Sequence, residues 1–198
     1  ARACIALNRA PEAKKALEKV LQADSGNTIA NRELGNIYYN EKSWARAIPL
    51  LKKIYKSAPD GELAYRIGKC YVESGVADSA LAYLKIARDK GGRTDVSLEL
   101  ARAYYGQKNY KSAAAEYDKV AGADMTAKDF YKMGVSIEKN GDKAAALNSF
   151  KSAVIRFGSS TDNEALLARE RVARAKLSER DFKGAVEDLQ FIVRADSK

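Results

Sequence analysis

Residues 34–59, LGNIYYNEKSWARAIPLLKKIYKSAP, decide the fold of this chain. Gly35 and Tyr38 belong to one run of apolar and small residues at helical spacing, and Ala47 and Leu51 belong to a second run that follows a polar break. Spacings of three and four residues place side chains on one face of a helix. The stretch therefore predicts two amphipathic helices that are joined by a short turn.

The same pattern recurs at a fixed step along the chain. Counterparts of Gly35 follow at steps of 33 residues, at Gly68, Ala101 and Gly134. A fifth copy is marked by Ala173, and a truncated copy with Ala13 precedes them all. We call Gly35 and its counterparts in the other copies the repeat marks. Each mark is followed 12 residues later by an alanine, and we expect these two small residues to meet between the helices. A repeated helical hairpin predicts a solenoid, because one hairpin cannot bury its apolar face alone.

The repeat frame divides the whole chain. We expect one solenoid domain over residues 1–198, formed by a partial repeat at 1–27 and by full repeats at 28–60, 61–93, 94–126, 127–160 and 161–198. The step to the last mark is 39 residues, and the extra residues fall in 156–164. Thr161 and Glu164 have the spacing of a capping box, which predicts that the next helix starts early and runs long. This segment either lengthens a loop and a helix without a binding role or forms a protruding edge at which a partner docks.

These residues resemble the tetratricopeptide repeat over essentially the whole chain. The copy that carries the resemblance best is Leu34-Gly35-x-x-Tyr38…Trp44-x-x-Ala47-x-x-x-Leu51-x-x-Ile54…Pro59. The resemblance implies an all-α, right-handed superhelix of about five full helical hairpins and one partial one. It also implies a protein–protein interaction scaffold that binds a partner protein or peptide in a concave groove, within a larger assembly. The chain reads as part of a longer protein, and its alanine-rich repeats look similar to bacterial multi-repeat proteins.

Composition argues against most catalytic chemistry. The 198 residues include no histidine and only two cysteines, Cys4 and Cys70, so the sequence offers no imidazole base and no zinc-binding set. We therefore expect no enzyme, no metal and no cofactor, and we expect the thiols to pack beside the first helices. No stretch is long and apolar enough to span a bilayer. The sequence leaves a cytoplasmic and an envelope-associated location both open.

The repeat frame also predicts which residues face the groove, at offsets −6, −3, +1, +4 and +5 from each mark. The residues that we single out are Arg32, Asn36, Tyr39, Asn40, Tyr65, Lys69, Glu73, Arg102, Tyr105, Lys128, Tyr131 and Arg174. Tyr38, Tyr71 and Tyr104 lie one position away and are expected in the core. Arg32, Lys69 and Arg102 are expected to face solvent and to favour a partner with acidic character. Changing all three to Glu should therefore leave the melting temperature unchanged.

Other interpretations remain open at this point. Polar side chains are expected on any helix face that is exposed to solvent, so the predicted groove residues need not indicate a binding site. The net charge of +9 suggests binding of nucleic acid or another anionic polymer, with bases stacked on Tyr39, Tyr65, Tyr105 and Tyr131, although the charge is too dispersed for a nucleic-acid arm. Apolar ends of the array suggest self-association.

Some related arrays clamp the terminal carboxylate of a chaperone, and one half of that clamp has a counterpart in this chain. Arg32 and Asn36 are similar to the first half of the clamp. Arg66, Asp95 and Glu99 depart from the second half, and the two acids would repel a carboxylate. The clamp is therefore not expected here.

Overall fold

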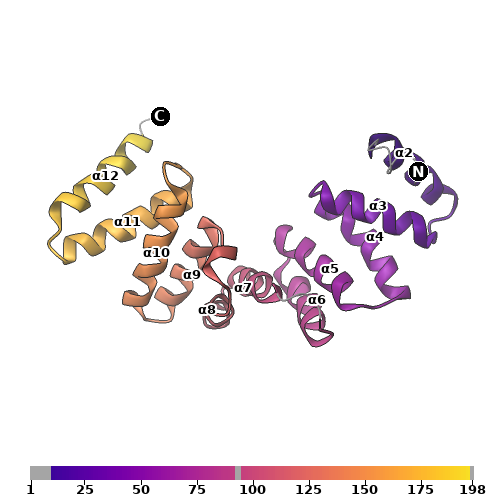
Figure 1. The fold of residues 1–198 in the computed structure, drawn as a ribbon, viewed down its shortest axis with the longest axis horizontal. Helices are drawn as coiled ribbons and strands as arrows, with labels where there is room; N and C mark the ends of the chain where they lie inside the picture. The colour runs from indigo at the N-terminus through magenta and orange to yellow at the C-terminus, as the bar shows by residue number, and fades with distance from the viewer. Residues whose placement is uncertain (1–9, 92–94, 197–198) are drawn as a thin grey trace. The chain divides into compact units, whose positions relative to one another are not determined.

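The computed structural model describes residues 10–91 and 95–196, so Cys4 lies outside the described residues. Every regular element in these ranges is helical (Figure 1). The predicted all-α architecture is therefore confirmed. The chain divides into two compact units, unit 1 over residues 1–107 and unit 2 over residues 108–198. The prediction of one domain over the whole chain stays a prediction.

The helices follow the predicted hairpins. Unit 1 contains α2 (Ala10–Ala23), α3 (Thr28–Asn40), α4 (Trp44–Ser57), α5 (Gly61–Glu73), α6 (Ala77–Asp89) and α7 (Val96–Gly106). Unit 2 contains α8 (Tyr110–Tyr117), the 3-10 helix η1 (Gly122–Asp124), α9 (Ala127–Lys139), α10 (Lys143–Phe157), α11 (Asn163–Ser178) and α12 (Phe182–Asp196). Within each unit, every α-helix packs against its neighbours in sequence. In addition, α5 packs against α7 and α9 packs against α11, so the first helices of neighbouring hairpins are in contact.

The small residue of each first helix permits a close approach to the second helix. A Cβ atom added at Gly68 would lie 2.6 Å from Cγ of Leu84, and one added at Gly134 would lie 2.7 Å from Cε1 of Phe150. In these two hairpins the atoms nearest to the glycine belong to the bulky residue 16 positions after the mark, and the expectation that the two small residues meet stays a prediction. Side chains on a helix lean toward its N-terminus, so Leu84 covers the turn that carries Ala80.

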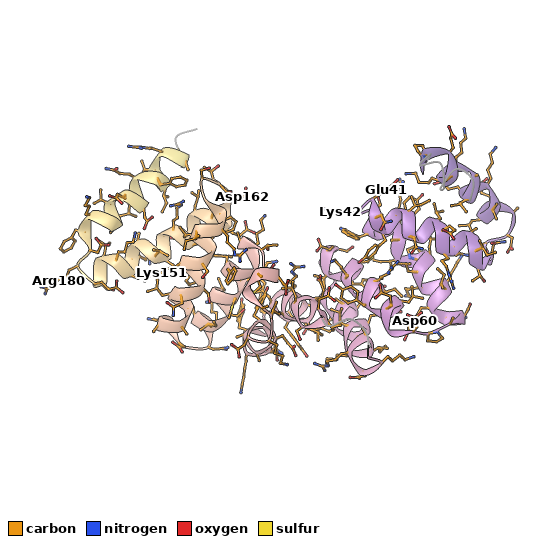
Figure 2. The ribbon with its side chains drawn as sticks, viewed as in Figure 1. Glu41, Lys42, Asp60, Lys151, Asp162 and Arg180 are labelled. Carbon is orange, nitrogen blue, oxygen red and sulfur yellow. The ribbon has the colours of Figure 1, made fainter. Side chains whose placement is uncertain are left out.

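Each hairpin turn uses the left-handed backbone region at the same place, seven residues after the mark. Gly75 and Gly141 occupy this position with φ of 72° and 98°. In the other three hairpins the residue at this position is Lys42, Lys108 or Arg180, with φ between 57° and 64°. Figure 2 shows Lys42 and Arg180 at the ends of their hairpins. A non-glycine residue is uncommon in this region, so the recurrence shows that the turn geometry belongs to the repeat and does not depend on the side chain.

Side chains cap the starts of α3, α5, α8, α9 and α10, whereas α4, α6, α7 and α11 have no side-chain cap hydrogen bond. Thr126 and Asp129 form a reciprocal capping box at the start of α9. The capping box expected at Thr161 and Glu164 is wrong, because Asp162 is the N-cap of α11 and makes no side-chain cap hydrogen bond. The extra residues nevertheless lengthen the helix, since α11 has 16 residues and α9 has 13.

The core of unit 1 follows the repeat pattern. Tyr38 is buried, as predicted, and Tyr71 and Tyr104 are partly buried against the core clusters. Cys70 is fully buried in the same core, and burial raises the pKa of its thiol to about 12. The thiol is therefore an apolar packing group and not a reactive thiolate.

Candidate partner-binding surfaces

A cleft of about 180 Å³ opens between the first helices of unit 1. Its lining combines residues of α3, α4 and α5 with the loop before α5, namely Arg32, Asn36, Leu51, Ile54, Asp60, Glu62, Leu63 and Arg66. Asp60, labelled in Figure 2, caps α5 by accepting a hydrogen bond from the backbone N–H of Leu63. The cleft therefore has an apolar floor and a rim with both charges.

Arg66 organises the rim of this cleft. Its Nε donates to Oε1 of Glu62 at 2.8 Å, and its Nη1 donates to Oδ1 of Asn36 at 2.9 Å. Its guanidinium group also lies over the ring of Tyr39, 5.4 Å from the centroid. Burial raises the pKa of Tyr39 to about 12, so its hydroxyl group stays protonated at neutral pH. One arginine thus connects α3 to α5 and fixes the groove side of both helices.

Glu99 of α7 is the buried charge of the groove. Only 2% of its side chain is exposed, and its Oε1 lies 3.1 Å from Nη1 of Arg102 and 3.4 Å from Nζ of Lys69. Its Oε2 is buried without a hydrogen-bond donor among the residues that the structure describes. Burial raises the pKa of Glu99 above its ordinary value of 4.5, although the two cations oppose this shift.

The ion pairs of Glu99 correct the expectation that Arg32, Lys69 and Arg102 are equivalent. Arg32 is exposed, whereas only 16% of the Arg102 side chain and 31% of the Lys69 side chain are exposed. Lys69 and Arg102 neutralise a buried carboxylate, so acidic residues at these positions would be destabilising. The expectation that all three side chains face solvent is therefore wrong, and we expect the triple change to Glu to lower the melting temperature, so Arg32 is the one suited to charge reversal.

Two tyrosines predicted to line the groove are buried instead. Tyr65 is 2% exposed, and its hydroxyl group donates to Oδ2 of Asp95 on the next hairpin at 2.9 Å. Tyr131 is 8% exposed and packs against the ring of Phe150, with centroids 6.0 Å apart. Tyr65 at offset −3 reaches the next hairpin, whereas Tyr131 at the same offset packs against the second helix of its own hairpin. Neither ring has a free face on which a nucleic-acid base could stack.

The other predicted groove residues of unit 1 are more accessible. Asn40 and Glu73 are exposed near the ends of their helices, and Tyr105 is partly exposed on α7. Tyr39 is partly exposed and makes an edge-to-face contact with Trp44, with centroids 5.6 Å apart. Tyr39, Asn40 and Glu73 lie on helices that line the cleft and Tyr105 lies on α7, but none of these side chains lines the cleft itself.

Unit 2 has a cleft of its own, of about 460 Å³, between α9, α10 and α11. Arg171 crosses it, with Nε 3.3 Å from Oε2 of Glu138, and its guanidinium group lies over the ring of Phe150. The predicted residue Arg174 also lines this cleft, where its exposed side chain contacts Glu170. The predicted Lys128 lies outside it.

Lys128 is an exposed residue of α9 that contacts the start of α11. Its Nζ lies 3.8 Å from Asp162 and 3.9 Å from Glu164. Both acids belong to the lengthened segment, and Asp162 is labelled in Figure 2. At these distances the contacts are weak, so Lys128 remains accessible to solvent.

The groove prediction missed the residues at offset −2. Arg66, Glu99 and Arg171 all stand two positions before a repeat mark, and each organises a cleft or an ion pair. Residues three positions apart share a helix face, so offset −2 lies beside offset +1, which the prediction included. That spacing was the signal that could have found them.

The last helix carries an exposed apolar stripe. Phe182, Val186, Leu189 and Val193 of α12 are between 38% and 64% exposed. This agrees with the expectation of apolar residues at the end of the array, while self-association through them stays a prediction.

The described residues contain no group of three or more metal-ligating side chains placed to hold an ion. In the same ranges, no helix combines the length and apolar character that crossing a membrane requires.

Stability should respond to the ionisation of Glu99. A raised pKa in the folded state means that Glu99 stabilises the fold below its ordinary pKa, and that this contribution is lost as the pH rises through the folded-state value. Glutamine does not titrate, so the free energy of unfolding of the parent minus that of Glu99→Gln should fall as the pH rises above the ordinary value of 4.5. Urea unfolding of both proteins across a pH series measures this difference. A difference that grows with pH would contradict the assignment.

Comparison with known proteins agrees with this architecture. The family described as tetratricopeptide repeat matches residues 1–62 and 65–128, which is more than half of the chain. The chain therefore belongs to the tetratricopeptide repeat family. No curated protein matches the sequence.

Solved structures with the same fold are distant in sequence. A MamA structure designated MSR-1 C2 is 21% identical, with a TM-score of 0.67 over 86% of this chain and 97% of that one. MamA from Desulfovibrio magneticus RS-1 is 16% identical, with a TM-score of 0.66 over 86% and 95%. YrrB, described as a TPR protein with an unusual peptide-binding site, is 22% identical, with a TM-score of 0.65 over 85% and 87%. At these identities the likeness establishes the fold.

Proposed function

We propose that the chain is a protein-interaction scaffold and that unit 1 binds an extended segment of a partner protein along its first helices. The observation that carries this proposal is the cleft between α3 and α5, which combines an apolar floor with a prearranged polar rim. Binding pockets commonly have this composition, because apolar surface supplies affinity and a few polar groups fix orientation.

The rim offers the groups that an extended peptide requires. Oδ1 of Asn36 is held by Arg66, which leaves the Asn36 amide N–H groups to donate to a peptide carbonyl. Glu62 is held by the same arginine and presents an acceptor on the other side. Because these side chains already pair in the free protein, binding loses less conformational entropy.

Arg32 gives the groove its preference for acidic partners. It is exposed on the rim, and its side chain makes no ion pair or hydrogen bond within the described ranges. Lys69 and Arg102 contribute less, because both share their charge with Glu99. A carboxylate side chain of the partner beside Arg32 is therefore the expected contact. The peptide-binding site named for YrrB, a protein with the same fold, supports binding of a peptide as the general class.

Selection of peptides from a random display library tests this function. We expect selected peptides to carry an acidic residue, and Arg32→Glu to weaken their binding by about tenfold or more, as for the loss of an arginine hot spot. Lys15→Glu on α2 is the matched control, since Lys15 is exposed and lies outside the cleft. Fluorescence anisotropy gives the dissociation constants. The groove assignment fails if all selected peptides bind the Arg32→Glu variant as tightly as the parent.

A further inference from the structure

The second helices of unit 1 carry a larger pocket that the groove proposal does not use. This pocket of about 650 Å³ is lined by Ile48, Pro49, Lys52, Lys53, Tyr55, Lys56, Pro59 and Tyr83. None of these residues lines the cleft between α3 and α5. The two surfaces are therefore separate, and one can be altered without changing the lining of the other.

The pocket has a fixed apolar floor. The rings of Tyr55 on α4 and Tyr83 on α6 meet edge to face, with centroids 5.6 Å apart, and Tyr83 also stacks on Tyr71 at 5.9 Å. Pro49 and Pro59 add exposed apolar surface with restricted backbone freedom. The floor therefore has a defined shape that an apolar side chain can enter.

The rim of the pocket is cationic and offers donors without acceptor side chains. Lys52 and Lys56 are exposed and make no ion pair or hydrogen bond within residues 10–91 and 95–196. Lys53 donates to the backbone oxygen of Ser25 at 2.9 Å and keeps its charge at the rim. The lining contains no Asp or Glu, and α4 as a whole contains none. The positive charge is therefore not neutralised locally.

We propose that this pocket is a second docking site, which binds an acidic peptide segment that carries an aliphatic or aromatic anchor residue. The anchor packs on the apolar floor that the two tyrosines form, and carboxylates on either side of it pair with Lys52 and Lys56. Charge complementarity selects the acidic segment, and the apolar floor supplies affinity that charge alone does not give.

A peptide fits these observations better than a nucleic acid does. Single-stranded nucleic acids bind by stacking bases on exposed aromatic faces along a continuous cationic track. Tyr83 stacks on Tyr71 and also meets Tyr55 edge to face, so the rings are in contact with one another. The rim of this pocket supplies three cations, Lys52, Lys53 and Lys56.

Fluorescence anisotropy with synthetic probes tests the proposal on the full chain. The probe is a short labelled peptide of Asp and Glu residues with one Leu and one Phe, and a second peptide carries Ser in place of the Leu and Phe. Lys52→Glu/Lys56→Glu should weaken binding of the first peptide by about tenfold or more. The matched control is Lys15→Glu/Lys19→Glu on α2, which makes the same change in net charge at exposed positions and should change binding less than about twofold. The Ser-containing peptide should bind more weakly than the first.

Each alternative outcome overturns the proposal. Equal losses in the two double variants would mean that binding depends on net charge, and equal affinity for the two peptides would mean that the floor contributes nothing. Oligothymidine, or vesicles with phosphatidylserine, that bind more tightly than the peptide and lose binding in Lys52→Glu/Lys56→Glu would assign the pocket to another class of ligand. Lys52→Glu/Lys56→Glu should weaken binding of the peptide probe to the same extent when Arg32→Glu is also present, which separates this result from that of the groove. Circular dichroism of each variant verifies that the helices are retained.

Discussion

Arg102→Glu is expected to lower the free energy of unfolding by about 3–5 kcal/mol at neutral pH, the range for breaking a buried ion pair. The new carboxylate would lie beside Glu99, whose side chain is 2% exposed and whose Oε2 is buried without a donor in the described part of the chain. Of the two cations that contact Glu99, only Lys69 would then remain. Urea unfolding followed by circular dichroism measures the change.

Two control variants distinguish this effect from a general effect of charge. Arg32→Glu makes the same chemical change at an exposed position of the groove, and it should alter the free energy of unfolding by no more than about 0.5 kcal/mol. Adding Glu99→Gln to Arg102→Glu should recover part of the loss, since the repulsion between two carboxylates is then removed. If Arg102→Glu and Arg32→Glu are equally stable, the buried ion pair does not support the fold as described.

Gly68→Ala is expected to destabilise the second full hairpin by about 1–3 kcal/mol, the usual cost of overpacking a core. The added methyl group would lie 2.6 Å from Cγ of Leu84, a fully buried side chain, and 3.2 Å from the backbone nitrogen of the same residue. Something must therefore move, and this strain outweighs the higher helix propensity of alanine, which favours it by about 1 kcal/mol. Thermal and urea unfolding measure the net effect.

Gly35→Ala is the matched control, because the same position in the preceding hairpin has more room. Its added methyl group would lie 3.2 Å from Cδ2 of Leu51, the end of a flexible side chain. The cost should therefore be smaller than at Gly68, and the gain in helix propensity can cancel it. Shortening the neighbour in the double variant Gly68→Ala/Leu84→Ala should give a smaller loss than the sum of the single changes. Equal losses at Gly35 and Gly68 would contradict the difference in packing.

The fold was predictable because it depends on a periodic signal. The spacing of Gly35, Gly68, Ala101 and Gly134 predicts the hairpins, and the helices of the structure follow them. A local pattern sufficed, since within each unit every α-helix packs against its neighbours in sequence. The capping box expected at Thr161 and Glu164 did not form, because two residues at the correct spacing do not determine where the helix begins.

The candidate sites were less predictable because they depend on contacts between hairpins. The residue types of Arg32, Lys69 and Arg102 are similar, yet only the structure shows that Glu99 holds two of the three. Tyr65 has the sequence offset of a groove residue, but Asp95 on the next hairpin draws its hydroxyl group inward. A single-sequence pattern gives the face of a helix and does not give the partner on the neighbouring helix.

Because the same left-handed turn recurs, the first and second helices of different hairpins can be exchanged at this position, in evolution or by design. Lys42, Lys108 and Arg180 adopt the same backbone geometry as Gly75 and Gly141, and all five side chains or Cα atoms are exposed. A crossover between two repeats at this position would preserve the register on both sides of the junction. First helices that carry one cleft could thus be recombined with second helices that carry another, so that recognition surfaces diversify while the hairpin frame is kept.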